Sequence, residues 1–532
     1  KLAVVQVDME ITEEGFLKLN IPVVSPQQPC YNNAYLPAVE ASLCYCLLTQ
    51  VVYDGRWNSG MADAIEINVP ENSRLNADPS QSVGYATVGI GFTFAAACTE
   101  SISRMYYISG LEEEVQASAS GGLVAFIAAG LNRFGTFCAN ILFSNAVSFG
   151  GGGRIDSDGL INYHFYNPWQ YISDFEADES VTNVMVLYSN RIPDSGGFGK
   201  HRAGPSNAQI AMFHKTPMAL PTIVGTGSRI TGNQGLYGGY PGHITKMVYL
   251  SNSNFYDLVK EGKPLPNEYE DVIDIRGKVS GDYQQFEASA PTIPMSAGTI
   301  VIYPQTTGGA LGDPIERDPQ LIIEDIRDGL ATVEVSKKVY AVALDHETIE
   351  VDLDETKKRR EARRKERISQ GVPGKEYIKD LVEKRKNREL PQPALDLIDE
   401  TINFSPAFKK QLEEEEKLLQ KELKPIGKIK MKKLIFKLTP HVNVVEDENG
   451  NKVAMCSHCD FAYCDAREDY KLYSLIYDRA PSGVMPLHLA PDDDWATYRE
   501  FYCPGCGSQT EVDQAPKGMP IIPNARIKGI SY

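Results

Sequence analysis

Two pairs of cysteines near the C-terminus constrain the fold of this chain more than any other feature of its sequence. Cys456 and Cys459 form one C-x2-C pair, and Cys503 and Cys506 form a second pair farther along the chain. A two-residue gap lets two thiolates reach one ion from a tight turn, and two such turns complete a tetrahedral site of four sulfurs. The spacing therefore predicts a metal site built from these four cysteines.

The residues around the pairs leave the ligands and the metal open. Cys464 and His458 lie in the same segment and are spare ligands. Zinc is the first choice of metal, and iron binds the same kind of ligands. Because four thiolates leave no position for a substrate or water, we expect the site to be structural. The alternative interpretation is a group of buried free cysteines, since thiols pack well as small apolar groups.

The charge and hydropathy of the chain exclude two classes of partner. A net charge of −17 over 532 residues argues against nucleic acid, because phosphate binding needs a positive field. A bilayer is spanned by roughly 18 or more apolar residues, and the most apolar stretch, Gly122–Leu131, is shorter than that. The sequence therefore predicts no membrane segment.

The five cysteines outside the cluster do not have the spacing of a disulfide framework. They lie among apolar or small residues, and we expect them to be reduced core residues: Cys30, Cys44, Cys46, Cys98 and Cys138. Reduced cysteines indicate that the chain is cytoplasmic.

The first 344 residues alternate helical and strand patterns, which predicts a mixed α+β fold. Leu2–Ile11 has the pattern of a strand, and Ala34–Val52 has the pattern of an apolar helix. A domain seldom begins within a strand, so we expect a preceding segment or another chain to complete this part of the fold.

Two glycine-rich loops, Ser148–Leu160 and Pro193–Pro205, lie in this first part of the chain. Neither loop matches a P-loop or the spacing of a dinucleotide fingerprint. Such loops suit either sharp turns or cradles for a ligand, and we favour turns in a mixed fold. If the second loop faces a ligand, its relevant polar groups are Asp194, Lys200, His201 and Arg202.

Two short helices are predicted after these loops. The first, Pro319–Leu330, ends at Gly329, a residue type typical of a helix end. The second helix runs to Tyr340, and Thr332 caps its start.

The composition changes abruptly near residue 352, and residues 352–433 are highly charged and interrupted by prolines. Their basic runs lack the interleaved aromatic residues that stack on RNA, so the pattern favours solvated helices that wrap a partner subunit. Residues 434–532 predict a small β-rich domain that carries the cysteines. We therefore divide the chain into residues 1–344, 345–433 and 434–532.

Three segments of the first region resemble motifs of the hydantoinase-B/5-oxoprolinase family. Gly312–Leu344 resembles the C-terminal signature of that family, and Gly150–Gly159 and Asp194–Pro205 resemble its two internal glycine-rich motifs. Ala203 stands where the family usually carries a second glycine. The resemblance covers residues 1–344 and implies that the upstream half of the family's fold is absent from this sequence.

The tail resembles a second family, the zinc-binding γ subunit of acetone carboxylase. The resemblance rests on Cys464-Asp465, Trp495, Arg499-Glu500 and the pair Cys503 and Cys506. The first cysteine pair departs from the γ-subunit pattern, which leaves open whether Cys459 or Cys464 completes the site. The charged region also resembles the extension that ketone carboxylases add to the hydantoinase-B fold.

Together the two resemblances imply a subunit of an ATP-dependent ketone carboxylase, acting on a ketone and bicarbonate through phosphorylated intermediates. They imply a hetero-oligomer with a hydantoinase-A-like subunit that binds ATP and Mg, and with a chain that supplies the upstream half. A catalytic manganese-type ion belongs to that half, so no catalytic residue is assigned here. The alternatives are a cyclic-amide hydrolase of the hydantoinase or oxoprolinase type and a non-catalytic assembly scaffold.

The histidines of the sequence are scattered and lack the spacing of metal ligands. This pattern agrees with assigning no catalytic metal ligand to this chain. We interpret seven of them as packed or surface residues: His164, His201, His214, His243, His346, His441 and His488. The eighth, His458, lies within the first cysteine pair and is the one with a case as a ligand.

Overall fold

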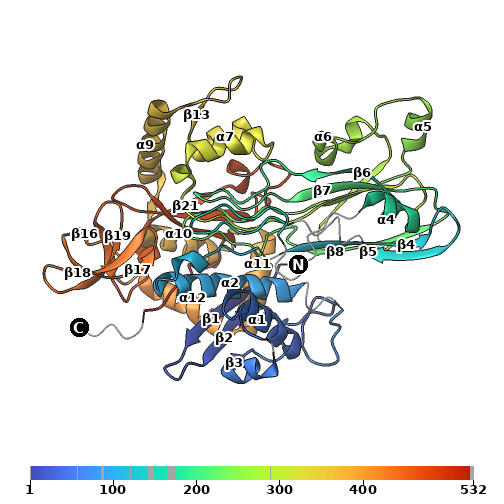
Figure 1. Cartoon of the computed structure of the whole chain (residues 1–532). Helices are drawn as coiled ribbons and strands as arrows, with labels where there is room; N and C mark the ends of the chain where they lie inside the picture. Colours follow the sequence, from blue (N-terminus) through green and yellow to red (C-terminus); the bar gives the residue numbers. More distant parts are fainter. Residues whose placement is uncertain are drawn as a thin grey trace.

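The computed structural model describes residues 2–56, 58–84, 89–119, 122–141, 149–163, 174–287 and 289–527. The chain has both helices and several sheets, so the predicted mixed α+β class is confirmed (Figure 1). Among the described residues, no helix combines the length and the apolar character needed to cross a bilayer.

The N-terminal layer is a three-stranded sheet covered by two helices. Its strands are Val5–Ile11 (β1), Leu17–Val24 (β2) and Ile65–Asn68 (β3), and its helices are Leu36–Gln50 (α1) and Ile90–Ile108 (α2). The short helices Ser59–Ala64 (η1) and Glu112–Glu114 (η2) flank this layer. Leu19 and Ile21 of β2 are buried against Leu43 of α1 and Phe94 of α2. The strand and the helix predicted for this region are confirmed.

Two antiparallel sheets pack face to face in the middle of the chain. The larger has the order β10-β9-β12-β7-β6, and the smaller has the order β11-β8-β4-β5. The larger sheet consists of Val184–Arg191 (β6), Asn207–Phe213 (β7), Met247–Ser251 (β9), Asp282–Phe286 (β10) and Ile300–Pro304 (β12). The smaller consists of Leu123–Leu131 (β4), Phe137–Ile141 (β5), Ala219–Thr226 (β8) and Ser289–Ala290 (β11).

Strand β7 shows how both faces of the larger sheet are covered. Ala211 and Phe213 point into the core between the sheets, whereas Ile210 and Met212 point into a second core on the opposite face. Alternation of this kind follows from the two-residue period of a strand. Small helices lie by the larger sheet: Phe175–Val181 (α4), Phe255–Lys260 (α5), Tyr269–Ile273 (α6) and Ile275–Gly277 (η3).

The glycine-rich loops pack against one another with their backbones in contact. Gly204 N donates to Gly151 O over 2.8 Å, and Gly153 N donates to Gly309 O over 2.9 Å. A Cβ atom on Gly150 would overlap the carbonyl oxygen of Gly204. The central part of Figure 1 shows these irregular segments running side by side. Close backbone approach therefore accounts for the glycines, in agreement with the interpretation as turns.

The helices predicted after the loops are present. They are Pro314–Glu316 (η4), Pro319–Arg327 (α7) and Val333–Tyr340 (α8), and the strands Ala343–Leu344 (β13) and Val351–Asp352 (β14) follow. Thr332 Oγ1 accepts a hydrogen bond from Val335 N, and Gly329 has φ +70° just after α7. Both predicted helix ends are confirmed.

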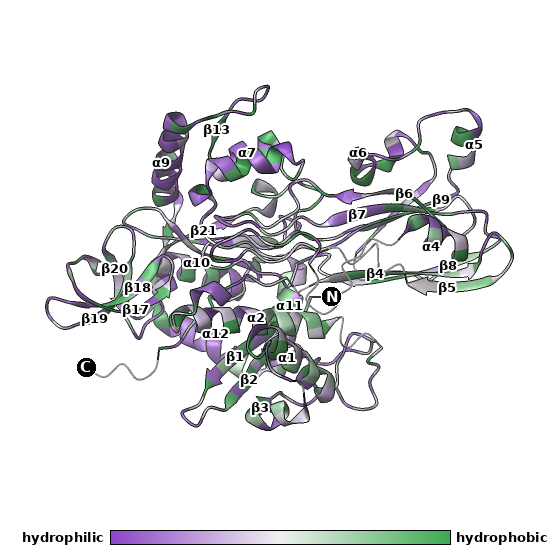
Figure 2. Ribbon diagram, in the orientation of Figure 1, coloured by the Kyte–Doolittle hydropathy of each residue, from purple (hydrophilic) through white to green (hydrophobic). Residues whose placement is uncertain are grey.

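The charged region forms four helices that pack on this chain. They are Leu353–Gln370 (α9), Gly374–Lys386 (α10), Gln392–Phe404 (α11) and Pro406–Leu418 (α12). Figure 2 shows α9 as mostly hydrophilic, yet α10 buries Ile378 and Leu381 in a core shared with C-terminal strands. The apolar faces of these helices and several of their arginines are therefore taken up within the chain, and contact of their exposed faces with a partner subunit stays a prediction.

The C-terminal part forms two further sheets. One has the order β16-β20-β19-β18-β17, and the other has the order β15-β21-β22-β23. The first contains Gly427–Lys428 (β16), Met431–Thr439 (β17), Val442–Asp447 (β18), Lys452–Cys456 (β19) and Phe461–Asp465 (β20). The second contains Val372–Pro373 (β15), Leu475–Arg479 (β21), Ala496–Tyr502 (β22) and Gln509–Pro516 (β23), with Tyr470–Tyr473 (η5) and Pro481–Gly483 (η6) alongside.

Buried charge pairs tie the three predicted ranges together. Arg367 of α9 makes a two-pronged pair with Asp313, at 2.7 and 2.9 Å, and both side chains are almost fully buried. Arg104 of α2 makes a similar pair with Glu511 of β23, at 2.8 and 3.2 Å. Because hydrophobic cores also cross residues 344 and 433, the division into three domains stays a prediction.

The cysteines outside the cluster are all free. Cys44, Cys46 and Cys98 are buried, as predicted, and Cys138 is half-buried. The prediction is wrong for Cys30, which is exposed. Cys30 follows Pro29 in a bend before α1. It lies outside any helix or strand that would place its side chain in a core.

The buried imidazole of His243 predicts a loss of stability in acid. Its Nε2 lies 2.8 Å from Ser206 Oγ and its Nδ1 lies 2.6 Å from Ile244 O, so both nitrogens are occupied in the neutral form. Burial lowers the pKa of His243 from 6.5 to about 4. A folded-state pKa below the unfolded one gives stability that is complete above about pH 6.5 and falls as the pH drops toward 4, by about 3 kcal/mol.

We therefore expect the urea midpoint of the chain to fall between pH 6.5 and 4, and His243→Gln to flatten that dependence. Replacing the exposed His346 in the same way is the matched control and leaves the dependence unchanged. An identical pH profile for His243→Gln and the unmodified chain would contradict the assignment.

Candidate functional site

The two cysteine pairs come together between the two C-terminal sheets. Cys456 and Cys459 flank the turn between β19 and β20, and Cys503 and Cys506 lie in the turn between β22 and β23. The four Sγ atoms all lie within 4.8 Å of one another. The Cys456–Cys506 and Cys459–Cys503 sulfur distances are 3.8 and 3.7 Å. The fold thus assembles the predicted four residues into one group.

The sulfur group fits a tetrahedral zinc ion. Sulfurs at about 2.3 Å from a central zinc form a tetrahedron with edges of about 3.8 Å, which the two distances above match. His458 N and Gly505 N each approach a cysteine sulfur to 3.4 Å, and amide donors of this kind stabilise thiolates. Gly505 also leaves room for the site, because a Cβ there would lie 2.8 Å from Cys459 Sγ.

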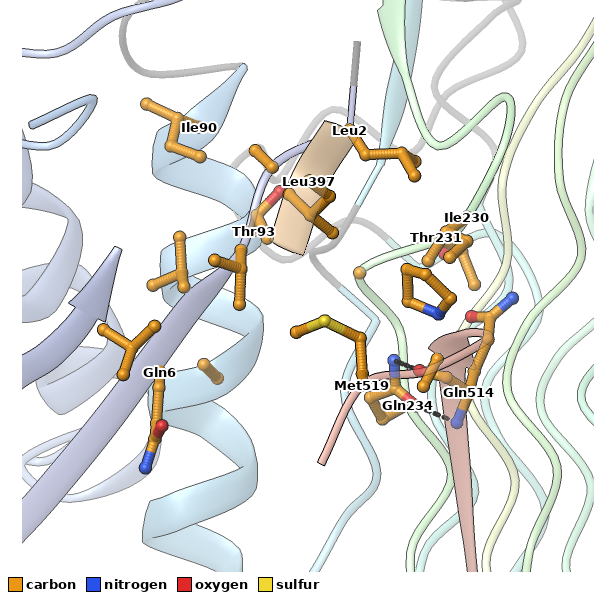
Figure 3. Close-up of a pocket in the computed structure, with 18 of the residues that line it drawn as sticks. Leu2, Gln6, Ile90, Thr93, Ile230, Thr231, Gln234, Leu397, Gln514 and Met519 are labelled. Atoms are coloured by element: carbon orange, nitrogen blue, oxygen red, sulfur yellow. Dashed lines mark hydrogen bonds between the residues drawn. The ribbon is translucent and has the colours of Figure 1, made fainter. Parts of the chain in front are cut away.

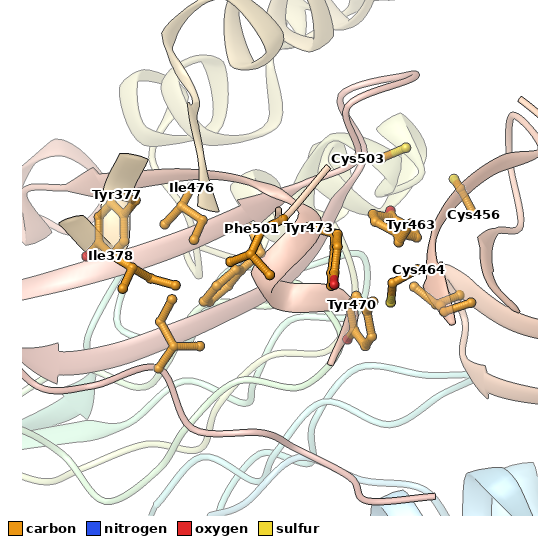
Figure 4. Close-up of a cluster of buried hydrophobic side chains, with 14 of the residues drawn as sticks. Tyr377, Ile378, Cys456, Tyr463, Cys464, Tyr470, Tyr473, Ile476, Phe501 and Cys503 are labelled. Atoms are coloured by element: carbon orange, nitrogen blue, oxygen red, sulfur yellow. The ribbon is translucent and has the colours of Figure 1, made fainter. Parts of the chain in front are cut away.

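Cys464, the alternative ligand, lies outside this group. It is buried in strand β20, and its Sγ lies 3.7 Å from Glu468 O. Figure 4 shows the sulfurs of Cys456 and Cys503 facing the same gap, with Cys464 farther from both. The geometry therefore favours Cys459 over Cys464 as the fourth ligand.

A large aromatic core stands beside the sulfurs. Its buried members include Tyr463, Tyr470 and Phe501, together with Tyr377 of α10 (Figure 4). Arg499 is buried within this region, where it donates to Tyr377 Oη over 2.8 Å and to Met519 O over 2.8 Å. The arginine singled out by its resemblance to the γ subunit is thus a link between α10 and the last segment of the chain.

A buried network of two arginines and two aspartates joins the three motifs of the first region. Arg317 is fully buried and donates to both oxygens of Asp158, at 2.6 and 2.7 Å. It also donates to Asp325 over 2.6 Å, and Arg202 donates to the same carboxylate over 2.6 and 2.9 Å. Burial opposes ionisation of Asp158, but the hydrogen bonds from Arg317 outweigh it, and the pKa of Asp158 is lowered.

Of the other polar groups of the second glycine-rich loop, Asp194 has a structural partner, Lys200 is exposed, and His201 keeps a buried Nδ1 without a hydrogen-bond partner among the described residues. Asp194 accepts hydrogen bonds from the backbone N and the hydroxyl of Thr332, while burial raises the pKa of Asp194. The backbone of His201 pairs with Leu311. The loop therefore serves the packing of α7 and α8. Ser148 of the first loop lies outside the described residues.

A cavity of about 750 Å³ lies between α2, β1, the segment 225–235 and the segment after β23 (Figure 3). Sites for small molecules commonly have volumes of this size. Polar atoms in its lining are buried without a hydrogen-bond partner among the described residues, including Arg74 Nε, Thr226 Oγ1 and both amide atoms of Gln514. Burial lowers the pKa of Arg74. This cavity is the candidate small-molecule site of the chain, and no sequence motif marks it.

The histidines are mostly isolated, as predicted, with one exception. His243 forms a hydrogen bond with the Ser206 hydroxyl, and His488 forms one with the Tyr269 hydroxyl. His346 is exposed. His441 is buried, in agreement with its interpretation as a packed residue, but its imidazole lies close to His458 and to Glu316, a grouping that was not predicted. The β17–β18 and β19–β20 turns meet at one end of a sheet, which the sequence spacing does not show. His164 lies outside the described residues.

Comparisons with known proteins agree with the two resemblances. Residues 2–314 match the family model described as hydantoinase B/oxoprolinase, and residues 429–528 match the model described as acetone carboxylase gamma subunit. The chain is 26% identical to the acetophenone carboxylase delta subunit of Aromatoleum aromaticum, over 70% of this chain and 54% of the relative. It is 24% identical to the acetone carboxylase alpha subunit of Xanthobacter autotrophicus, over 76% of this chain and 53% of the relative.

A nucleotide-free structure of acetone carboxylase, solved for the mechanism of ATP-dependent acetone carboxylation, shares the fold. The TM-score is 0.70 at 22% identity, over 77% of this chain and 54% of the solved chain. The present chain therefore spans about half the length of the curated relatives it matches.

Proposed function

The chain belongs to the hydantoinase B/oxoprolinase family, and we propose that it is a subunit of an ATP-dependent ketone carboxylase complex. The observation that carries this proposal is the presence of a hydantoinase B region and an acetone carboxylase γ-type region on one chain. The relatives that share the longer region are named as subunits of acetophenone and acetone carboxylases. On this proposal one polypeptide combines what resembles a large subunit and a γ subunit.

The proposed reaction joins a ketone and bicarbonate into a β-keto acid. Phosphoryl transfer from ATP converts the enolate of the ketone into an enol phosphate and bicarbonate into carboxyphosphate, and cleavage of the enol phosphate by water releases phosphate and returns the enolate. Carboxyphosphate then breaks down to CO₂ and phosphate, and the enolate carbon forms the new bond to CO₂. The sequence holds no P-loop, so we propose that a hydantoinase-A-like partner binds ATP and Mg, and that a chain with the upstream half holds a manganese-type ion.

Within this assembly we propose that Cys456, Cys459, Cys503 and Cys506 hold a structural zinc ion. The support is the converging sulfur geometry and the match to the γ-subunit family. Such an ion supplies a fixed junction between two turns, and four thiolates leave no position for substrate. The free cysteines of the chain support a cytoplasmic complex.

The test is an assay of the purified complex for ATP hydrolysis that depends on both ketone and bicarbonate. We expect hydrolysis with acetone or acetophenone to rise at least about tenfold over the rate without ketone, with radiolabelled bicarbonate appearing in the keto acid. Omitting either substrate is the internal control, since a carboxylase needs both. Hydrolysis that is independent of bicarbonate would contradict the proposal.

The second candidate is a cyclic-amide hydrolase, which the oxoprolinase side of the family favours. Hydantoin and oxoproline are the discriminating substrates. Their ATP-dependent opening without incorporation of bicarbonate would move the assignment to this class. A scaffold role for the C-terminal sheets is compatible with either enzyme, because a site of four thiolates has the composition of a structural centre and leaves no position for substrate.

A further inference from the structure

We propose that Glu316, His441 and His458 form a second metal site, distinct from the four-cysteine group, for a divalent transition metal such as zinc. This site does not depend on the ketone carboxylase assignment. It rests on the position, burial and unmet hydrogen bonding of these three side chains.

The three side chains come from separate elements that meet beside the cysteine turns. Glu316 ends η4, His441 lies in the turn between β17 and β18, and His458 lies in the turn between β19 and β20. One carboxylate oxygen and one nitrogen from each ring lie within 4.8 Å of one another. The two imidazole rings are 5.2 Å apart between centroids, and His458 Nε2 is 3.7 Å from Glu316 Oε1. Small movements of these three side chains would bring their ligand atoms to the spacing found around one ion.

The state of His441 is an independent observation that points to a ligand. Only 2% of the residue is exposed, and neither ring nitrogen has a hydrogen-bond partner among the described residues. A buried polar atom left without a partner costs about 1–3 kcal/mol, and native structures rarely keep one. A metal bound to the nitrogen that faces Glu316 and His458 would remove that cost on one side of the ring.

Charged groups around the cluster are compatible with a cation. Arg364 donates to Glu316 Oε1 over 3.1 Å and also to Ser508 Oγ, so the oxygen that faces His458 already accepts one hydrogen bond, and an ion would share Oε1 with Arg364 or take Oε2 after the carboxylate rotates. The nearby charge of Arg367 is neutralised by its pair with Asp313. Burial lowers the pKa of His441, which keeps its imidazole in the neutral form that binds metals.

Two imidazoles and one carboxylate select a borderline divalent metal and leave at least one coordination position open. The four sulfurs, in contrast, close their site completely. An ion held by Glu316, His441 and His458 would fasten η4, which begins at the last residue of the hydantoinase B match, to two turns of the C-terminal sheet. The site would thus clamp the two family regions together.

The experiment counts cobalt in the full chain, purified in its complex and reconstituted with Co²⁺ after removal of bound metal. We expect His458→Ala to lose one ion per chain relative to the unmodified protein, while the thiolate-to-cobalt absorption of the four-cysteine site keeps its intensity. His346→Ala is the matched control, because His346 is an exposed histidine 3.2 Å from Glu334, and it retains every ion.

His441→Asn provides a second variant, since asparagine fills part of the same buried space. We expect the same loss of one ion, with the thiolate absorption again unchanged. Equal cobalt content in His458→Ala, in His441→Asn and in the unmodified protein would overturn the proposal. Loss of the thiolate absorption together with the ion in both variants would also overturn it, because the cluster would then serve only the cysteine site.

Discussion

Replacing Cys503 with serine removes one zinc ion per chain and unfolds the C-terminal sheets. Cys503 is fully buried, and its sulfur lies 3.7 Å from that of Cys459. A structural zinc contributes about 10–16 kcal/mol of apparent binding free energy in small zinc domains, so its loss is comparable with the whole stability of a typical domain, about 5–15 kcal/mol. We expect elemental analysis to find about one zinc fewer and proteolysis to cut the chain beyond residue 430.

Cys464→Ser is the matched control for this experiment. Cys464 is as deeply buried as Cys503 and belongs to the same core, but its sulfur lies outside the metal group. We expect the control to keep its zinc and to show at most a modest loss of stability from burying a hydroxyl. Zinc content that falls in Cys464→Ser and persists in Cys503→Ser would reverse the assignment of ligands.

The cysteine site was predictable from the sequence because its geometry is mostly local. Each C-x2-C turn positions two sulfurs by itself, so the fold has only to bring two turns together. The choice between Cys459 and Cys464 was not predictable, since both lie near the first turn. It depends on the bend at Asp460, which has φ +57° and separates Cys459 from strand β20.

Other features depend on contacts between residues far apart in the chain. Arg367 lies in a run of charges that is typical of a solvated helix, and only the fold shows that it pairs with Asp313 in the interior. The cluster of Glu316 and His441 depends in the same way on how two sheets and η4 meet. Composition averages over a segment and cannot identify the single side chain that is turned inward.

The glycine-rich motifs show a third case, in which the residues were recognised and their role was not. Asp158 and Arg202 belong to the two loops, and Arg317 belongs to the signature that follows them. The fold joins them through Asp325 in one buried network. The motifs therefore include residues that hold the loops together, a role that needs tertiary structure to be seen.

Arg317→Met destabilises the chain by about 3–5 kcal/mol, because removing one partner of a buried charge network leaves the others uncompensated. Arg317 donates hydrogen bonds to Asp158 and Asp325 and is fully buried. Methionine fills much of the space, so the loss reports charge and hydrogen bonding more than volume. We expect a clear fall in the urea midpoint of the purified chain.

Arg327→Met supplies the comparison, since Arg327 is an exposed arginine at the end of α7. Exposed substitutions of this kind change stability by about 0.5 kcal/mol or less. Arg317→Lys tests the geometry, because lysine keeps the charge but lacks the planar fork that reaches both oxygens of Asp158. If Arg317→Lys matches the unmodified chain, charge alone suffices. If Arg317→Met also matches it, the network contributes nothing to stability, and the loops must be held by backbone packing alone.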